Sequence, residues 1–147
     1  MTLTRKGQEF TTGSARFHDS ASNHLEPGSK VFVRFRIAHL EHEFLGLLDT
    51  GATWSIVDWE IAVLAGLRPE SGHRIRYSGR WGTIEGSVVT CSFLLPASEG
   101  EPLEIQGSVF VSTDWRAGNF IGYRGLLERI RFALDPQENR FYFGPCA

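Results

Sequence analysis

The chain has 147 residues, of which 41% are hydrophobic and 22% are charged, and its formal net charge is −2. This length suffices for one domain with its own core, and the charge provides no basic surface of the kind that binds nucleic acid. No apolar run approaches the roughly 18 residues that span a membrane, and the N-terminus lacks the apolar region of a signal peptide. We therefore expect a cytoplasmic protein with neither a nucleic-acid nor a membrane partner.

The first 29 residues are polar and contain scattered Gly, Ser, Asn and Pro. They predict an N-terminal arm (residues 1–29) that is at best partly ordered, with a short strand near residues 15–18, followed by one domain over residues 30–147. His18 and His24 in this arm have no partner at metal-binding spacing, so we interpret them as surface histidines. We predict no metal site and no cofactor.

Strand signals begin at residue 31. Apolar residues at positions 33, 35 and 37 alternate with Arg34 and Arg36, which predicts a half-buried strand. The polar residues 39–43 then predict a turn, and His39 and His42 within it are not expected to bind metal. The return strand, residues 43–48, ends at Asp49.

A short helix is predicted after the next strand, residues 55–57. Asp58 stands at the N-cap position, Gly66 at C′, and Pro69 prevents continuation. Its expected buried face consists of Ile61, Leu64 and Ala65.

A long hairpin is predicted over residues 73–95. Gly79 and Gly82 bracket its tip, as a tight turn requires, and place Arg80 and Trp81 between them. An exposed tip is an unusual place for Trp81, because a Trp side chain favours burial. A further strand is expected over residues 103–111.

The C-terminal part combines a helix signal with a hairpin signal. Residues 123, 126, 127 and 130 are apolar at helical spacing, which predicts a helix after Gly122. Residues 132–134 and 140–143 flank the Pro-containing turn 135–139 and predict a closing hairpin.

Two motifs carry a family resemblance. Asp49-Thr50-Gly51-Ala52 follows the apolar run Phe44–Leu48 and resembles the active-site signature of aspartic proteases. Phe120-Ile121-Gly122 resembles the second signature of the retroviral-type (retropepsin-like) members, in which a strand runs beside the catalytic loop. Arg124 departs from the Asp or Asn that many members have two positions after that Gly. The resemblance implies an all-β fold, a retropepsin-like barrel with a flap hairpin and one or two short helices.

The resemblance also implies a reaction and a partner. The chain has one Asp-Thr-Gly motif, whereas the chemistry needs two carboxylates, so a homodimer would contribute one Asp49 per subunit. The pair would act as base and acid in peptide-bond hydrolysis. Thr50 would brace the two loops across the dimer, and Gly51 would leave room for the substrate backbone. Ala52 lacks the hydroxyl that some members have there, which favours a mildly acidic optimum.

The same resemblance assigns Gly79, Arg80, Trp81 and Gly82 to a flap that covers a peptide substrate. Trp81 would then lie either on bound peptide or against its own subunit. Two alternatives to an endopeptidase remain open. One is a catalytically silent dimer that serves as a peptide-binding or assembly module, and the other is an unrelated β-barrel in which Asp49 only caps a turn.

Overall fold

The computed structural model describes residues 2–19 and 30–146. Within these ranges the chain is mostly β-sheet with one short α-helix, which confirms the predicted all-β class. His24, whose role as a surface residue was predicted, lies outside the described residues. The boundary after residue 29 and the closed barrel stay predictions.

The secondary structure follows the predicted order. Short strands open the chain at β1 (Thr4–Arg5), β2 (Gln8–Glu9) and β3 (Gly13–Arg16). The middle of the chain contains β4 (Phe32–Ile37), β5 (Phe44–Leu48), β6 (Ser55–Ile56), α1 (Trp59–Leu64), the 3-10 helix η1 (Pro69–Ser71), β7 (His73–Gly79) and β8 (Gly82–Leu95). The remainder consists of β9 (Glu99–Gly100), β10 (Leu103–Val111), β11 (Phe120–Ile121), the 3-10 helix η2 (Leu127–Arg129), β12 (Ile130–Asp135) and β13 (Arg140–Pro145).

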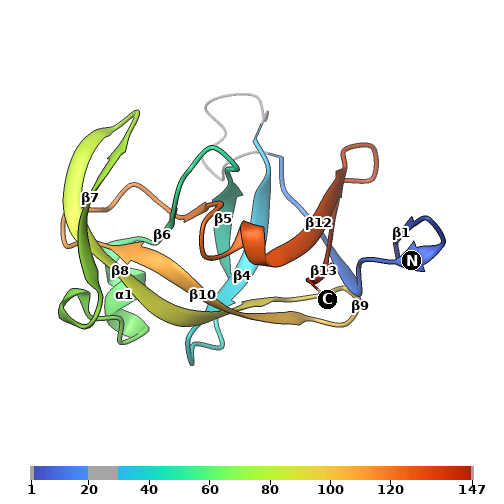
Figure 1. Ribbon diagram of the computed structural model, residues 1–147, viewed down its shortest axis with the longest axis horizontal. Coiled ribbons are helices and arrows are strands. Elements are labelled where there is room, and N and C mark those ends of the chain that lie inside the picture. The colour runs from blue at the N-terminus through green and yellow to red at the C-terminus, as the bar shows by residue number, and fades with distance from the viewer. Residues whose placement is uncertain (1, 20–29, 147) are drawn as a thin grey trace.

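Most of these strands belong to two sheets. A seven-stranded sheet has the order β10-β6-β11-β5-β4-β8-β7, and β10 also pairs with β8. A four-stranded sheet has the order β12-β13-β3-β9. Figure 1 shows the β7–β8 hairpin at one end of the molecule and the β12–β13 hairpin toward the other. In the order of its sheet, β7 is a terminal strand that pairs with β8, so the hairpin projects from the sheet edge.

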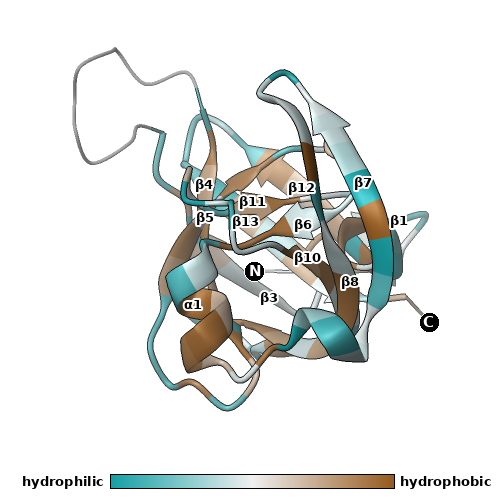
Figure 2. Ribbon diagram, turned by 90° about the vertical axis from the view of Figure 1, so that its left-hand side faces the viewer, coloured by the Kyte–Doolittle hydropathy of each residue, from teal (hydrophilic) through white to brown (hydrophobic). Residues whose placement is uncertain are grey.

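Apolar side chains gather in two clusters. The larger one fills the space between the sheets and includes fully buried Phe35, Phe93 and Phe143. The smaller one lies under the β7–β8 hairpin and is built on Ile56, Tyr77, Phe110 and Trp115. Figure 2 shows hydrophobic segments concentrated on the inner strands, with hydrophilic segments on much of β7. The smaller cluster places aromatic rings directly beneath the hairpin.

Part of the N-terminal segment is ordered within the second sheet. β3 pairs with β13 on one side and β9 on the other, so it is an inner strand. The strand predicted near residues 15–18 is therefore found two residues earlier, at Gly13–Arg16.

The predicted C-terminal helix is wrong in extent. Only η2 forms after Gly122, because Gly125 has φ of +78°, which interrupts a right-handed helix. Gly125 also packs so closely on Ser108 that a Cβ atom would lie 2.8 Å from its Cβ. Tertiary packing against β10 thus overrides the helical periodicity, and Tyr123 points away from the core, 50% exposed.

The first helix is confirmed, with two corrections. α1 ends before Gly66, whose φ of +72° fits the predicted C′ residue. Asp58 precedes the helix, but its carboxylate accepts a hydrogen bond from the Gly118 amide (3.1 Å) instead of capping the helix. Ala65 is buried as predicted, whereas Leu64 is exposed, so the buried face is narrower than expected. No helix among the described residues is long and apolar enough to cross a membrane.

The two cysteines differ in burial, and this difference can be tested by chemical labelling. Both are unpaired: Cys91 on β8 is buried, and Cys146 near the C-terminus is exposed. Burial raises the pKa of the Cys91 thiol to about 12, because desolvation disfavours the thiolate. The reactive thiolate is therefore scarce at Cys91 below that pH. We predict that iodoacetamide at mildly alkaline pH labels Cys146 and spares Cys91 until urea unfolds the protein, as followed by peptide mass spectrometry. Labelling of both at equal rates in the native protein would contradict this placement.

Candidate active site

Asp49 lies at the end of β5, where the chain turns toward β6. Its amide donates a hydrogen bond to the Ile121 carbonyl (2.9 Å), which anchors the start of the turn. Its Oδ1 accepts a hydrogen bond from the Gly51 amide (2.9 Å), and its carbonyl accepts one from the Ala52 amide (3.1 Å). Among the described residues, nothing donates a hydrogen bond to Oδ2. The turn therefore orients the carboxylate and leaves one of its oxygens available.

The segment around β11 holds this turn in place. β11 pairs in parallel with the end of β5, where Ile121 lies opposite Leu48, and antiparallel with β6. Further along, the Tyr123 and Arg124 amides donate hydrogen bonds to the carbonyls of Ala52 (2.9 Å) and Thr53 (2.8 Å). The strand predicted to run beside the Asp49 loop is therefore found there.

Gly122 is required by the closeness of this packing. Its amide donates a hydrogen bond to Ser55 Oγ (2.9 Å), and a Cβ atom at this position would lie 2.5 Å from the carbonyl carbon and oxygen of Trp54. Because the clashing atoms belong to the backbone, no side-chain movement could relieve the contact. Phe120, Ile121 and Gly122 thus position the loop that contains Asp49.

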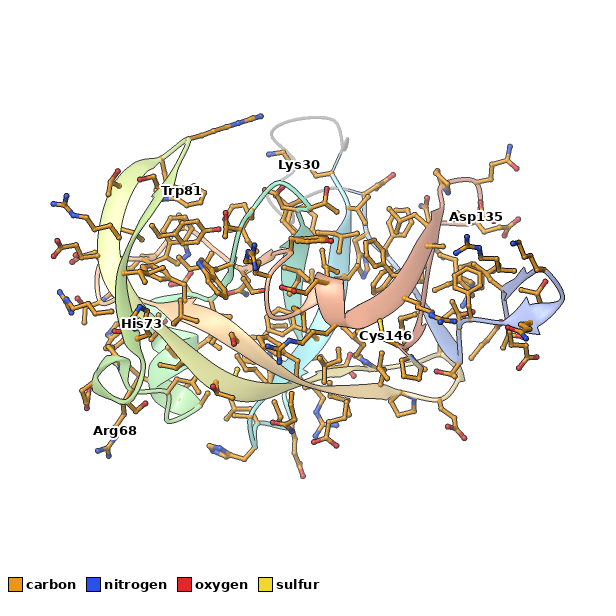
Figure 3. All side chains as sticks on the ribbon, in the orientation of Figure 1. Lys30, Arg68, His73, Trp81, Asp135 and Cys146 are labelled. Atoms are coloured by element: carbon orange, nitrogen blue, oxygen red, sulfur yellow. The ribbon has the colours of Figure 1, made fainter. Side chains whose placement is uncertain are left out.

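The β7–β8 hairpin forms as predicted, and its tip lies over the same region. Gly79 pairs with Gly82, which leaves a two-residue turn of Arg80 and Trp81. Gly82 has φ of +107°, a value that residues with a side chain rarely adopt. Figure 3 shows the Trp81 side chain on the inner side of the hairpin. Of the two orientations expected for Trp81, the structure has the one in which it packs against its own chain.

An aromatic group receives the Trp81 ring. Its centroid lies 5.4 Å from that of Tyr77, 4.9 Å from that of Trp115 and 5.9 Å from that of Phe120. The contacts to Tyr77 and Trp115 are edge-to-face, which is the favoured geometry for aromatic pairs. Trp81 is nevertheless 37% exposed, because it covers this group from outside.

Tyr77 links the hairpin to the Asp49 loop. Its hydroxyl donates a hydrogen bond to the Trp54 carbonyl (2.9 Å) and accepts one from the Trp54 amide (3.0 Å). Burial is the main cause that raises the pKa of Tyr77, and the negative charge of Asp49 raises it further. The hydroxyl therefore stays protonated and can act as donor and acceptor at once.

These elements surround a cavity of about 640 Å³. Its lining combines Asp49, Gly51 and Ala52 from the loop with Tyr77, Gly79, Arg80 and Trp81 from the hairpin and Phe120 from β11. The cavity is also lined by Lys30, Val31, Leu47, Leu48, Thr53 and Ser78. Residues from both predicted motifs and from the hairpin therefore meet at one site.

The remaining predicted residues lie near this cavity without lining it. Thr50 is exposed, and among the described residues its hydroxyl has no hydrogen-bond partner. Ile121, Gly122 and Gly82 support the loop and the hairpin turn from outside the cavity. The described residues also contain no group of three or more potential metal-binding side chains.

Sequence reasoning missed two residues of the site. The candidate site residues predicted from the sequence include neither Tyr77 nor Trp115. The structure buries Trp115 to 4% exposure and joins its indole N–H to the Gly118 carbonyl (2.7 Å). A large aromatic residue within an otherwise polar segment was the available signal, since such a side chain favours burial.

Comparison with solved structures identifies the fold. The chain is similar to a retropepsin-like aspartic protease from Rickettsia conorii, with a TM-score of 0.58 over 92% of this chain and 94% of that one. The sequence identity is 16%, so the likeness shows the fold and nothing finer. A scan of protein-family models and a search of curated proteins gave no match.

The Tyr77 bridge can be tested by Tyr77→Phe. Removing the hydroxyl leaves the amide and the carbonyl of Trp54 without this partner, and we expect the free energy of unfolding to fall by about 1–3 kcal/mol. Urea denaturation measures the change. Tyr123→Phe is the matched control, because Tyr123 is exposed and its hydroxyl makes no hydrogen bond among the described residues. Equal stability of the two variants would show that the bridge contributes nothing.

Proposed function

We propose that this protein is an aspartic endopeptidase that acts as a homodimer. The observation that carries the proposal is the arrangement of Asp49: one carboxylate oxygen is bound by the Gly51 amide, the other has no donor among the described residues, and the group lines a cavity. A residue that only capped its turn would not need to border a cavity beneath a hairpin. The likeness in fold to a retropepsin-like protease supports the same reading.

The chemistry requires two such carboxylates. Two Asp49 side chains brought together across a two-fold axis would share one proton, because two adjacent negative charges are costly. The ionised carboxylate removes a proton from a water molecule, whose oxygen attacks the peptide carbonyl carbon. The protonated carboxyl donates its proton to the oxygen of the peptide carbonyl. As the C–N bond breaks, the departing nitrogen takes up the proton that the first carboxylate removed from water, and a hydroxyl of the tetrahedral intermediate returns a proton to the other carboxylate. An acid and an amine are released, and the pair again shares one proton.

Two features of the single chain support dimerisation. The chain provides one Asp-Thr-Gly motif, so a second copy is the simplest source of the other carboxylate. Thr50 is exposed beside Asp49, and its hydroxyl is available to a partner loop. In this proposal the two Thr50 side chains brace the paired loops.

The cavity suits an extended peptide. It runs from the Asp49 loop to the tip of the β7–β8 hairpin and is lined by both apolar and polar residues. Residues 76–85 of the hairpin pair only with each other, because β8 meets β10 from Ser87 onward, so the tip can move without breaking pairs with other strands. A peptide bound between loop and hairpin would present its backbone to the two carboxylates, with Gly51 leaving space for it.

Replacement of the carboxylate tests the proposal. Asp49→Asn retains an oxygen that accepts from the Gly51 amide, so the loop should keep its shape. We expect wild-type protein to cleave a peptide library between about pH 4 and pH 7, and the variant to lose at least about 100-fold in rate. Mass spectrometry of the products measures both rates.

The control for this experiment is Asp135→Asn, at the turn between β12 and β13, where Asn can still accept the turn hydrogen bond (Figure 3). It should cleave as the wild type does. Equal cleavage by Asp49→Asn would remove Asp49 from the mechanism, and an optimum well below about pH 4 would contradict the role given to Ala52. Peptide binding with no cleavage by any protein would favour the non-catalytic binding module.

Subunit mixing tests the shared site. If each dimer needs Asp49 from both chains, random exchange between equal amounts of wild type and Asp49→Asn leaves about one quarter of the dimers fully wild type. The activity per wild-type chain should then fall to about half. Mixing with Asp135→Asn should cause no loss. An activity per wild-type chain that does not change with added Asp49→Asn would show that one chain suffices.

A further inference from the structure

The Trp81 side chain lies on a surface made of other aromatic rings. It belongs to the two-residue turn of the β7–β8 hairpin, yet its indole packs inward on Tyr77, Trp115 and Phe120. It also lines the cavity that contains Asp49. The ring therefore covers an apolar surface beside the carboxylate.

The surface under Trp81 is held independently of Trp81. The Trp115 indole is fixed by its hydrogen bond to the Gly118 carbonyl, and the Tyr77 hydroxyl is fixed by the backbone of Trp54. Phe120 is part of β11, which pairs with strands on both sides. These three residues, here called the aromatic subsite, would keep their positions if the Trp81 ring left.

Trp81 itself is held by weaker constraints. Its backbone belongs to the turn at the tip of a hairpin that pairs with the sheet through β8, and its side chain is more than one third exposed. The ring lies across Gly79 so closely that a Cβ atom there would be 2.5 Å from it. A rotation of the side chain, or a small movement of the tip, would uncover the aromatic subsite.

We propose that Trp81 is a displaceable plug of the aromatic subsite, and that the protein selects peptides with a large apolar side chain, aromatic above all, which takes the place of the indole. This inference rests on the proposed peptidase function for its substrate. An incoming aromatic ring restores the edge-to-face contacts that the Trp81 ring gives up, so the exchange is nearly balanced. A glycine or a charged residue restores none of them, and a charge would also lose its hydration.

Vacating the subsite provides a test that needs no catalysis. Trp81→Ala should bind free indole and N-acetylphenylalaninamide at least about tenfold more tightly than wild type, because its subsite is open. Ligand-detected NMR titration measures both affinities. N-acetylglycinamide should bind no better to the variant than to wild type. Leu64→Ala is the control, since it removes an exposed apolar side chain from α1. Equal affinity of Trp81→Ala and wild type for indole would overturn the plug.

A second variant tests the proposal even if Trp81→Ala fails to fold. Gly79→Ala keeps the indole but places a methyl group where the ring now lies, and the φ of Gly79 is not in the left-handed region. The ring must therefore shift from its present place on the subsite, and Gly79→Ala should bind indole more tightly than wild type does. Wild-type affinity in this variant, with its fold verified by circular dichroism, would also overturn the plug.

Cleavage separates the inference from the function on which it rests. With peptide pairs that differ only by Phe or Gly at the cleaved bond, wild type should prefer Phe, and Trp81→Ala should lower KM for the Phe peptide several-fold while leaving that for Gly unchanged. Cleavage without such a preference would overturn the substrate class and leave the peptidase intact. Absence of cleavage with tight indole binding by Trp81→Ala would overturn the peptidase and leave the plug intact.

Discussion

The structure depends on the hydrogen bonds that place β11 between β5 and β6. These bonds join the Asp49 loop to a segment about 70 residues later in the chain, through the Asp49, Tyr123 and Arg124 amides. Gly122 makes the approach possible, because a side chain there would collide with the Trp54 backbone. The segment pairs the Asp49 amide and the carbonyls of Ala52 and Thr53, which fixes the course of the loop. The position of the carboxylate is thus set by backbone contacts.

The β7–β8 hairpin, in contrast, is held over the loop mainly by side chains. Its terminal strand pairs with one neighbour, so its position over the loop depends on a few side-chain contacts, above all the Tyr77 hydroxyl on the Trp54 backbone. Tyr77 contacts Phe110 below and Trp81 above, and it therefore belongs both to the core and to the site. The base of the hairpin is thus fixed by hydrogen bonds and ring contacts, whereas its tip pairs with no strand outside the hairpin.

Local patterns predicted most of the fold. The strands at residues 31–37, 43–48, 73–95 and 103–111 were all found, since alternating side chains report directly which face of a strand is buried. The prediction of a helix after Gly122 was wrong, because tertiary packing that the local pattern does not reveal prevents it. Gly125 packs against Ser108 on β10 in a conformation that interrupts a right-handed helix, and Leu126 and Leu127 are buried just before and at the start of η2 instead.

The sequence by itself determined the parts of the site whose chemistry is local. The local pattern predicted a strand that ends at Asp49 and a turn at Gly51, and the family resemblance predicted a strand at Phe120-Ile121 beside that turn. Only the tertiary structure decided that Trp81 folds inward, that Trp115 is buried, and that Tyr77 bonds a residue 23 positions earlier. The physical reason is that ring packing depends on partners brought together by strand pairing. The alternation of residues along one strand shows which of its faces is buried, but not which aromatic rings of other segments contact that face.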